Sequence, residues 1–294
     1  MGQGVNFVVS SHDDPNEFLE LAGDLLAQDE TKNNLILGLA LRLKQDLQAF
    51  GQARPLMALV RDDFGNIAAA AVMTPPFPVV VYCEPINQFA LEALVDFLLV
   101  NEWQVSGVNG VEAVSEAFAR IWQEKTGQAS RIVVRMRAYE LRSVVRVEYP
   151  DGEMRLAKPH EAQVAADMLN AMGDEVVLGP RRIVTAESQV RQIEGGNVFF
   201  WEDSGKIVTV TIANRPQIKG ICLSGVYTLP EQRKKGYARA LVAEVSRELL
   251  RRGYELTNLF TDLSNPTSNK IYQEVGYQPV CDYHQYEFVS DARI

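Results

Sequence analysis

The chain has 294 residues, of which 47% are hydrophobic and 23% are charged, and its formal net charge is -9. This is the composition of an ordinary globular protein, and the length suffices for a large core and for two domains. The acidic balance argues against a general nucleic-acid binder, whose contact surface would be basic. Three scattered cysteines, Cys83, Cys222 and Cys281, argue against a disulfide framework and a zinc site.

The first residues show no basic segment followed by an apolar run, and no stretch of the chain is long and apolar enough to cross a bilayer. We therefore expect a cytoplasmic protein without a membrane partner. His12, His160 and His284 have no partner at the spacing of a metal site, so no metal is expected. The sequence is compatible with a monomer or a homodimer.

The first half of the chain alternates strand-like apolar runs with longer segments of helical periodicity. The predicted order is a strand, two helices, antiparallel strands, and then alternating strand and helix. In the second predicted helix, leucines recur at four-residue steps, at Leu35, Leu39, Leu43 and Leu47. The predicted elements are residues 5–10, 17–28, 33–50, 56–61, 67–74, 78–83, 88–100, a short strand around Gly107, 112–126 and 132–141.

After a polar bridge, residues 142–152, the same order of elements begins again. We therefore predict an α/β fold of two tandem domains, residues 1–141 and 153–294, each a mixed central sheet flanked by helices. The first copy is interpreted as degenerate, because no loop like that at residues 230–238 precedes its helices. The predicted elements of the second copy are residues 153–157, 159–172, 185–192, 198–201, 206–214, 221–229, 239–252, 256–263, a short helix after residue 264, and 282–289.

A loop containing proline, glycine and several charges joins the predicted strand 221–229 to the helix 239–252. Residues 233–238 of this loop read Arg-Lys-Lys-Gly-Tyr-Ala. A strand, a glycine loop and a helix N-terminus together present unpaired backbone N–H groups and the positive end of a helix dipole to an anion. The spacing matches neither the nucleotide P-loop nor the dinucleotide fingerprint, but the arrangement still predicts a site for a phosphate group.

This loop resembles the pyrophosphate loop of the GCN5-related N-acetyltransferases (GNAT family), Gln/Arg-x-x-Gly-x-Gly/Ala. The pattern is filled by Arg233, Lys234, Lys235, Gly236, Tyr237 and Ala238. A second family signature follows in the expected order, an asparagine, a small residue, a tyrosine and then Gly-Tyr, within residues 265–277. The resemblance implies acetyl-CoA as co-substrate, with its pyrophosphate wrapped by the loop amides. It also implies that Asn265 and Ser268 or Asn269 lie near the pantetheine arm or the CoA phosphates.

The reaction implied by the resemblance is transfer of an acetyl or other short acyl group from coenzyme A to an amine. Tyr272 stands at the family position beside the thioester sulfur, where its hydroxyl would act as the general acid for the leaving thiolate. The preceding strand, with Val226, Tyr227 and Thr228, would hold the cofactor. The main chain of Val226 and Thr228 would pair with the pantetheine amides, and the Val226 N–H would polarise the acyl carbonyl. Gly225 is expected to form a bulge that separates two parallel strands.

The general base is not identified by the sequence. Many relatives place a carboxylate on the central strand or its neighbour, but residues 221–229 contain none. The carboxylates nearby in sequence are more typical of turns and caps, and a hydroxyl could instead relay the proton through water. These carboxylates are Glu202, Asp203, Glu231 and Asp262, and the hydroxyls are those of Ser224 and Tyr227.

The leading hypothesis is an acetyl-CoA-dependent N-acetyltransferase that acts on an amine of a small molecule or a protein. The alternative is a non-catalytic protein that binds or senses acyl-CoA and keeps the loop for the ligand alone. Tyr272 favours catalysis, whereas the missing carboxylate favours the alternative. A transferase that uses aminoacyl-tRNA is disfavoured by the acidic charge. The first half either forms one wall of the acceptor cleft or only stabilises the second half.

Overall fold

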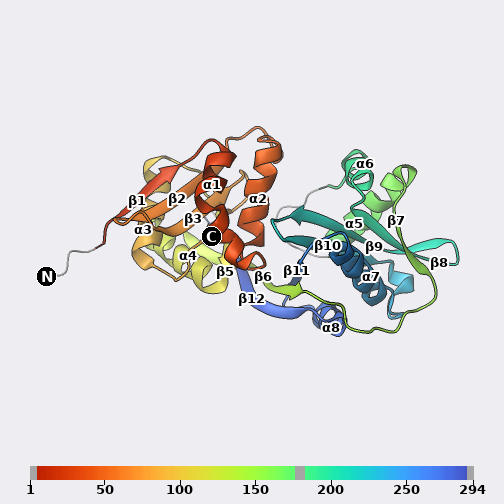
Figure 1. The fold of residues 1–294 in the computed structure, drawn as a ribbon. Helices are drawn as coiled ribbons and strands as arrows, with labels where there is room; N and C mark the ends of the chain where they lie inside the picture. Colours follow the sequence, from red (N-terminus) through yellow and green to blue (C-terminus); the bar gives the residue numbers. More distant parts are fainter. Residues whose placement is uncertain (1–4, 176–182, 290–294) are drawn as a thin grey trace. The chain divides into compact units, whose positions relative to one another are not determined.

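The structure is a computed structural model that describes residues 5–175 and 183–289. The chain forms two compact units. Unit 1 consists of residues 1–136 and 281–294, and unit 2 consists of residues 137–280. Each unit is a sheet flanked by helices, which confirms the predicted α/β fold with two copies (Figure 1). Residues 1–4, which carry part of the expectation about the start of the chain, lie outside the described residues.

Unit 1 contains a sheet in the order β1-β2-β3-β4-β5-β12. β4 and β5 are parallel, and the other neighbouring pairs are antiparallel. The elements are β1 (Phe7–Ser11), α1 (Pro15–Leu26), η1 (Ala27–Asp29), α2 (Asn34–Gln45), β2 (Leu56–Asp62), β3 (Ile67–Met73), β4 (Val79–Tyr82), α3 (Gln88–Val100), β5 (Gly107–Val111) and α4 (Glu112–Thr126), and β6 (Ala129–Leu141) begins in this unit.

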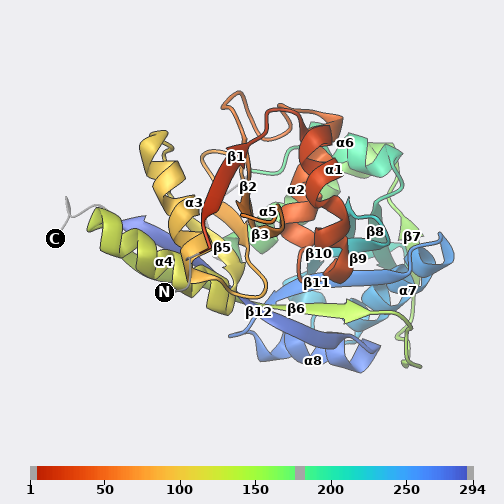
Figure 2. The same ribbon diagram turned by 60° about the vertical axis from the view of Figure 1, so that its left-hand side comes forward.

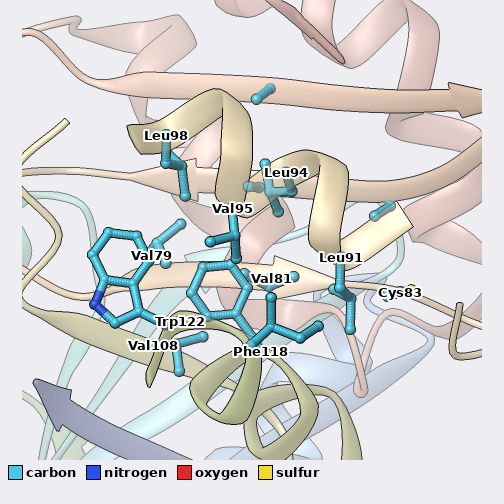
Figure 3. Close-up of a cluster of buried hydrophobic side chains, with 14 of the residues drawn as sticks. Val79, Val81, Cys83, Leu91, Leu94, Val95, Leu98, Val108, Phe118 and Trp122 are labelled. Carbon is cyan, nitrogen blue, oxygen red and sulfur yellow. The ribbon is translucent and has the colours of Figure 1, made fainter. Parts of the chain in front are cut away.

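The core of unit 1 lies on both faces of its sheet. On β2, Leu56 and Ala58 pack with α3 and α4, whereas Met57 and Leu59 pack with α1 and α2. Figure 2 shows the two helix pairs on opposite sides of the strands. Figure 3 shows the first of these clusters, in which side chains of α3 and the rings of Phe118 and Trp122 from α4 lie together beside the valines of β4. Because both faces are buried, these strands are continuous apolar runs.

Helix α2 ends earlier than the leucine pattern predicts. A step of four residues advances about 40° beyond a full turn, so leucines at such steps drift around the helix. The buried stripe is instead Ile36, Leu37, Ala40 and Leu43, and Leu47 lies beyond the end of the helix and is exposed. The predicted helix over residues 33–50 is therefore too long at its C-terminal end.

Unit 2 repeats the element order of unit 1. Its strands follow the order β6-β11-β10-β9-β8-β7, in which β10 and β11 are parallel and the pairs from β10 to β7 are antiparallel. The elements are β7 (Glu153–Leu156), η2 (Pro159–Glu161), α5 (Ala162–Glu175), α6 (Ala186–Glu194), β8 (Val198–Asp203), β9 (Lys206–Pro216), β10 (Gly220–Thr228), η3 (Pro230–Gln232), α7 (Tyr237–Arg251), β11 (Leu256–Asp262) and α8 (Pro266–Val275).

The central strand β10 is covered on both faces. Ile221 and Leu223 pack with α7, whereas Tyr227 packs with α5 and α6. Helix α7 is strongly amphipathic, and its buried stripe includes Leu241, Val245 and Leu249 at helical spacing. The position of α7 is therefore fixed by its packing on β10, which places the start of the helix just after the end of the strand.

The last strand of the chain completes the sheet of unit 1. β12 (Gln278–Val289) leaves unit 2 after residue 280, and its residues Tyr283 to Glu287 pair antiparallel with β5. The ring of Phe288 stacks on Trp122 of α4, with ring centroids 5.0 Å apart. The compact units therefore differ from the ranges 1–141 and 153–294, because strand pairing joins segments that are far apart in sequence.

The bridge between the two copies, residues 142–152, is attached to unit 2. The Val145 N–H donates to the carbonyl of Val275 in α8, and the indole N–H of Trp201 donates to the carbonyl of Asp151. Tyr149 stacks on Trp201 with ring centroids 6.2 Å apart. This segment therefore packs against unit 2 along its length, although its polar sequence is typical of a free linker.

The pairing of β12 with β5 predicts a strong effect of a single methyl group. A Cβ at Gly107 would lie 2.0 Å from the carbonyl oxygen of Tyr286 in β12, whereas a Cβ at Gly23 in α1 would meet nothing within 4 Å. We expect Gly107→Ala to lower the free energy of unfolding by about 1–3 kcal/mol through overpacking. Gly23→Ala is the control and should raise it by about 0.5–1 kcal/mol. Urea unfolding measures the free energy of unfolding of both variants. Equal stability of Gly107→Ala and wild type would contradict the pairing of β12 with β5.

Candidate functional site

The central strand of unit 2 contains a bulge at Gly225. On β9, Ile212 pairs with Ser224 and Val210 pairs with Tyr227, so two residues of β10 stand opposite one residue of β9. Gly225 has a φ of +65°, which favours glycine. A Cβ there would also lie 2.6 Å from Leu169 of α5. The predicted bulge at Gly225 is thereby confirmed.

The strands β10 and β11 diverge before this bulge is reached. Their parallel register runs from Gly220 opposite Leu256 to Cys222 opposite Asn258, and it does not continue beyond that pair. The second half of β10 therefore pairs with β9 on one side, and no strand is paired among the described residues along its other edge, which is called the opening below. An extended ligand can pair with a strand edge of this kind as an added strand would.

The backbone of β10 presents N–H groups to this opening. The Leu229 N–H donates to Val208 of β9, and N–H directions alternate along a strand, so the N–H of Val226 and Thr228 faces away from β9. The carbonyl of Thr228 accepts a hydrogen bond from Arg233 Nε at 3.0 Å. The two N–H groups are thus not used by β9, and the carbonyl of Thr228 is already bonded within the protein. That Val226 and Thr228 bind a cofactor stays a prediction.

The loop after β10 enters α7 through two residues with left-handed backbone. Lys234 has a φ of +65°, and Gly236, the N-cap of α7, has a φ of +89°. Gly236 supplies no side-chain cap, and the first hydrogen bond of the helix runs from the Ala240 N–H to the carbonyl of Gly236. Within the described chain, the N–H groups of residues 237–239 have no acceptor. They are therefore unpaired at the positive end of the helix, where an anion would be stabilised, and this position is called the candidate anion site.

The side chains of the loop contribute less charge than its sequence suggests. Lys234 and Lys235 are exposed, and Lys235 Nζ donates to Gln232 at 2.8 Å. Arg233 is paired with Glu175 at the end of α5, at 2.7 Å, and hydrogen bonding to Arg233 lowers the pKa of the Glu175 carboxyl. Glu175 also accepts from the Tyr227 hydroxyl at 3.1 Å. Arg233 and Tyr227 therefore fasten β10 and the loop to α5 by their side chains.

Tyr237 and Ala238 serve the loop through their backbone. The Tyr237 ring is buried, and its hydroxyl donates to Asp203 Oδ2 at 2.5 Å. This hydrogen bond is the main cause that raises the pKa of Tyr237 to about 12. Ala238 is half-buried in the first turn of α7. The Tyr237 side chain thus points into the protein, and only its N–H faces the candidate anion site.

The predicted site residues of α8 are largely engaged in local structure. Asn265 is the N-cap, and its side chain accepts from the Ser268 N–H at 3.0 Å. The Asn269 amide donates to the carbonyls of Asp262 and Asn265 and accepts from the Tyr139 hydroxyl at 3.0 Å. Asn269 therefore joins the end of β11 to α8 and β6. The structure gives its carboxamide no free donor for a cofactor.

Tyr272 lies in α8 and is almost fully enclosed. Its relative exposure is 7%, and its ring lies against Tyr139 and Tyr277, with centroids 6.4 Å and 6.0 Å away. Burial raises its pKa above the ordinary value, so the hydroxyl is protonated at neutral pH. No partner for this hydroxyl is found among the described residues, whereas the Tyr277 hydroxyl meets both Ser246 and Thr257. Tyr272 therefore retains a donor that the protein does not use.

The carboxylates considered as bases are mostly committed elsewhere. Glu202 pairs with Arg155 at 2.5 Å, Asp203 accepts from Tyr237, and Asp262 accepts from the hydroxyl and N–H of Ser264 at 2.7 Å. Glu231 is exposed beside η3. Within residues 5–175 and 183–289, no group of acidic, histidine and cysteine side chains could hold a metal ion. Over the same ranges, no helix has the length and apolar character to cross a membrane.

Asn214 and Arg215, near the end of β9, are two polar residues that no sequence motif indicates. Asn214 Nδ2 donates to Ser224 Oγ at 2.6 Å, and Arg215 Nη2 donates to Cys222 Sγ at 2.8 Å. Arg215 also has a φ of +46°, which is unusual for a residue with a side chain. The only signal in the sequence is the interruption of an apolar run by Asn-Arg, which reads equally well as a turn.

Comparisons with known proteins agree with this architecture. Residues 201–289, which include β10, the loop, α7, β11 and α8, match the family model described as FR47-like protein. No curated protein matches the sequence. A Drosophila protein of solved structure aligns over 97% of this chain and 99% of its own, with a TM-score of 0.67 and 14% identity.

Two further solved structures are similar to this chain, and both are named as GNAT proteins. A GCN5-related N-acetyltransferase from Sphaerobacter thermophilus covers 96% of this chain and 95% of its own, with a TM-score of 0.58 and 20% identity. A tandem GNAT protein from the clavulanic acid biosynthesis pathway covers 97% of this chain and 98% of its own, with a TM-score of 0.56 and 11% identity. The chain has the fold of the GCN5-related N-acetyltransferases. The GNAT resemblance drawn from the two motifs is thereby confirmed at the level of the fold.

The hydrogen bond from Tyr237 to Asp203 holds the start of α7, just after the loop, and predicts a dependence of stability on alkaline pH. The pKa of Tyr237 in the folded protein is about 12 and exceeds the ordinary value of 10.0. The stabilisation by this hydrogen bond is therefore complete below pH 10 and is lost as the pH rises towards 12. The slope of the free energy of unfolding against pH reports how many protons folding takes up. We expect Tyr237→Phe to lower this number by about one between pH 10 and pH 12. Asp203→Asn should act in the same direction, because it removes the charge that raises the pKa. Urea unfolding from pH 8 to pH 11 measures this, and slopes identical to wild type in both variants would rule it out.

Proposed function

We propose that unit 2 binds acetyl-CoA and transfers its acetyl group to an amine. The observation that carries the proposal is the continuity of β10, η3 and α7, which places two outward N–H groups of an open strand next to an unpaired helix N-terminus. The first suits an amide-containing arm, and the second suits a diphosphate. These are the two parts of coenzyme A that the main chain of a protein can recognise.

The residues of this chain fit the cofactor on structural grounds. A diphosphate would accept hydrogen bonds from N–H groups at the start of α7, with Lys234 and Lys235 exposed beside them. The pantetheine amides would pair with the main chain at Val226 and Thr228. Glycine is favoured at position 236 because the backbone there is left-handed. Space is not the reason, because a Cβ would meet Arg239 and Pro150 only at ordinary contact distances of 3.7 Å and 4.0 Å. The loop shape therefore depends on the backbone of Gly236 more than on free space.

The chemistry requires a neutral amine, an electrophilic carbonyl and an acid for the leaving group. Bound acetyl-CoA supplies the acyl carbon, and a new C–N bond forms as the C–S bond breaks. The Val226 N–H donates to the acyl oxygen. The amine loses its extra proton to solvent, and the Ser224 hydroxyl is the side chain next to the bulge that could carry it. The nitrogen loses a second proton to solvent once the C–N bond has formed. The sulfur leaves as a thiolate that accepts a hydrogen bond from Tyr272, and it takes up one proton from water when the thiol is released.

The raised pKa of Tyr272 decides between two roles for its hydroxyl, proton transfer to the leaving sulfur and a hydrogen bond to it. A thiol has a pKa near 8.5 and an ordinary tyrosine one near 10, so full proton transfer to a thiolate costs about 2 kcal/mol or more. Burial of Tyr272 increases that difference. A hydrogen bond from the intact hydroxyl to the developing thiolate carries no such cost. We therefore assign Tyr272 the role of a donor that stabilises the leaving sulfur, with the net proton supplied as the thiol is released.

Replacement of Tyr272 by phenylalanine tests the proposal. We expect Tyr272→Phe to bind acetyl-CoA as wild type does but to lower kcat by roughly 100-fold, within the range typical of a lost hydrogen-bond donor to a developing negative charge. Tyr139→Phe is the matched control, because it removes a hydroxyl from the adjacent ring that bonds Asn269 and faces no proposed substrate. Its kcat should stay within about threefold of wild type, since only a local hydrogen bond is lost.

Binding is measured by titration calorimetry, and turnover is measured by thiol release with a panel of amines. A wild-type protein that binds acetyl-CoA tightly but releases thiol with no amine would favour the non-catalytic alternative, an acyl-CoA-binding or sensing protein. Turnover that is unchanged in Tyr272→Phe would contradict the role of Tyr272 while leaving the transferase intact. Absence of acetyl-CoA binding would overturn both functions.

A further inference from the structure

Arg215 occupies a second irregularity of the β9–β10 pair. Pro216 stands opposite Ile221 and Asn214 stands opposite Cys222, so Arg215 is the extra residue of a bulge. Its φ is +46°, in the left-handed region that side chains rarely adopt. Such backbone conformations persist only where surrounding structure enforces them, and they concentrate at binding sites. The bulge turns the Arg215 side chain towards β10, where Nη2 reaches Cys222 Sγ at 2.8 Å.

The charge of Arg215 has no counterion within the protein as described. The side chain is half-buried, and no carboxylate of residues 5–175 or 183–289 forms an ion pair with it. Its Nε is enclosed and has no hydrogen-bond acceptor in these ranges. A guanidinium removed from water without an anionic partner is costly, whereas a carboxylate matches its planar donors in a bidentate pair. The position therefore favours an anion supplied by a ligand.

Asn214 and Ser224 lie on the same face of the sheet beside this cation. Asn214 pairs with Cys222 and Ile212 pairs with Ser224, so these four side chains point to the face that carries α5. The Asn214 carboxamide bonds Ser224, and its Oδ1 is enclosed without a partner among the described residues. If the carboxamide were turned over, its nitrogen would be the unpaired atom instead. One polar atom is left to meet a ligand in either orientation.

This cluster lies next to the point where the acyl group would be attacked. Ser224 directly precedes the Gly225 bulge, and the opening between β10 and β11 begins after Cys222. Residues two apart on a strand are separated by about 6–7 Å, which is the distance from Cys222 to Ser224 along β10. A small molecule with a carboxylate at Arg215 would therefore place a group a few bonds away beside the bulge.

We propose that Arg215 binds the carboxylate of the acceptor, and that the acceptor is a small amine carrying a carboxylate, such as an α-amino acid. Asn214 and Ser224 orient its amino group towards the acyl carbon. This inference rests on the proposed function, because the bound amine is the nucleophile of the transfer described above. The reaction is unchanged: a C–N bond forms, the C–S bond breaks, and the amine proton leaves to solvent.

The test compares each amino acid with its amide. The amide lacks the carboxylate, and the same loss lowers the pKa of its amine, so intrinsic reactivity at neutral pH favours the amide. A preference of the protein for the acid therefore reports recognition. We expect the wild-type protein to acetylate at least one small amino acid with a kcat/KM at least tenfold above that for its amide.

Arg215→Met should remove this preference. The variant should raise KM for the amino acid by about 10- to 100-fold with little change in kcat, as expected for loss of a charge-assisted hydrogen bond, and it should leave the amide reaction unchanged. Arg215→Lys should restore part of the affinity. Arg191→Met, at an exposed position of α6, is the control and should behave as wild type.

Acetyl-CoA titration separates this inference from the proposed function. If wild type and Arg215→Met both bind acetyl-CoA equally but acids and amides react alike, the carboxylate site is wrong and the transferase stands. The same conclusion follows if only amines without a carboxylate are acetylated, or if Arg215→Met affects acids and amides equally. If wild-type protein does not bind acetyl-CoA, the proposed function and this inference fall together.

Discussion

The left-handed backbone of Gly225 is the constraint on which the site of unit 2 depends. It lets β10 carry one extra residue while β9 continues, which shifts the register between Ser224 and Tyr227. The missing side chain also lets Leu169 of α5 approach the strand. Beyond this point the N–H groups of Val226 and Thr228 face an opening rather than a neighbouring strand. A larger residue at this position would strain the backbone and push α5 from β10 at once.

The same strand sets the place of the candidate anion site. The chain leaves β10 through η3 and enters α7 at Gly236, and α7 packs back on Ile221 and Leu223 of the strand it follows. The N-terminal amides of α7 must then lie near the end of the opening. In the proposed function, recognition of the cofactor rests mainly on backbone groups, because the Arg233 side chain is held by Glu175 and Thr228. A site of this kind depends on the shape of the loop more than on its net charge.

The sequence predicts local features well and long-range pairing poorly. The order of helices and strands, the Gly225 bulge and the resemblance of residues 233–238 to a pyrophosphate loop follow from short patterns, and the fold confirms the first two directly. The place of β12 in unit 1 could not be predicted, because the pairing of Tyr283 with Val111 joins segments that no local pattern relates. The packing of the bridge 142–152 on unit 2 was missed for the same reason.

The side chains of the site were harder to predict than its backbone. Asn269 matches a family position, yet its carboxamide is used by Asp262, Asn265 and Tyr139, which only the folded arrangement reveals. The sequence marks Arg215 only by the interruption of an apolar run, because its unusual backbone and its lack of a counterion among the described residues are properties of the β9–β10 bulge. Tyr272 remains a prediction, supported by an enclosed ring with a hydroxyl that has no partner among the described residues.

The central claim is that the backbone at the start of α7 binds the diphosphate of acetyl-CoA, and two glycines at the ends of this helix allow a direct test. Gly236 precedes α7 with a φ of +89°, and Gly253 follows it with a φ of +106°, so alanine strains both positions by about 1–3 kcal/mol. Titration calorimetry of acetyl-CoA into both variants compares them under equal strain. The account predicts binding at least tenfold weaker in Gly236→Ala and unchanged in Gly253→Ala. Equal affinities in the two variants and wild type would contradict it.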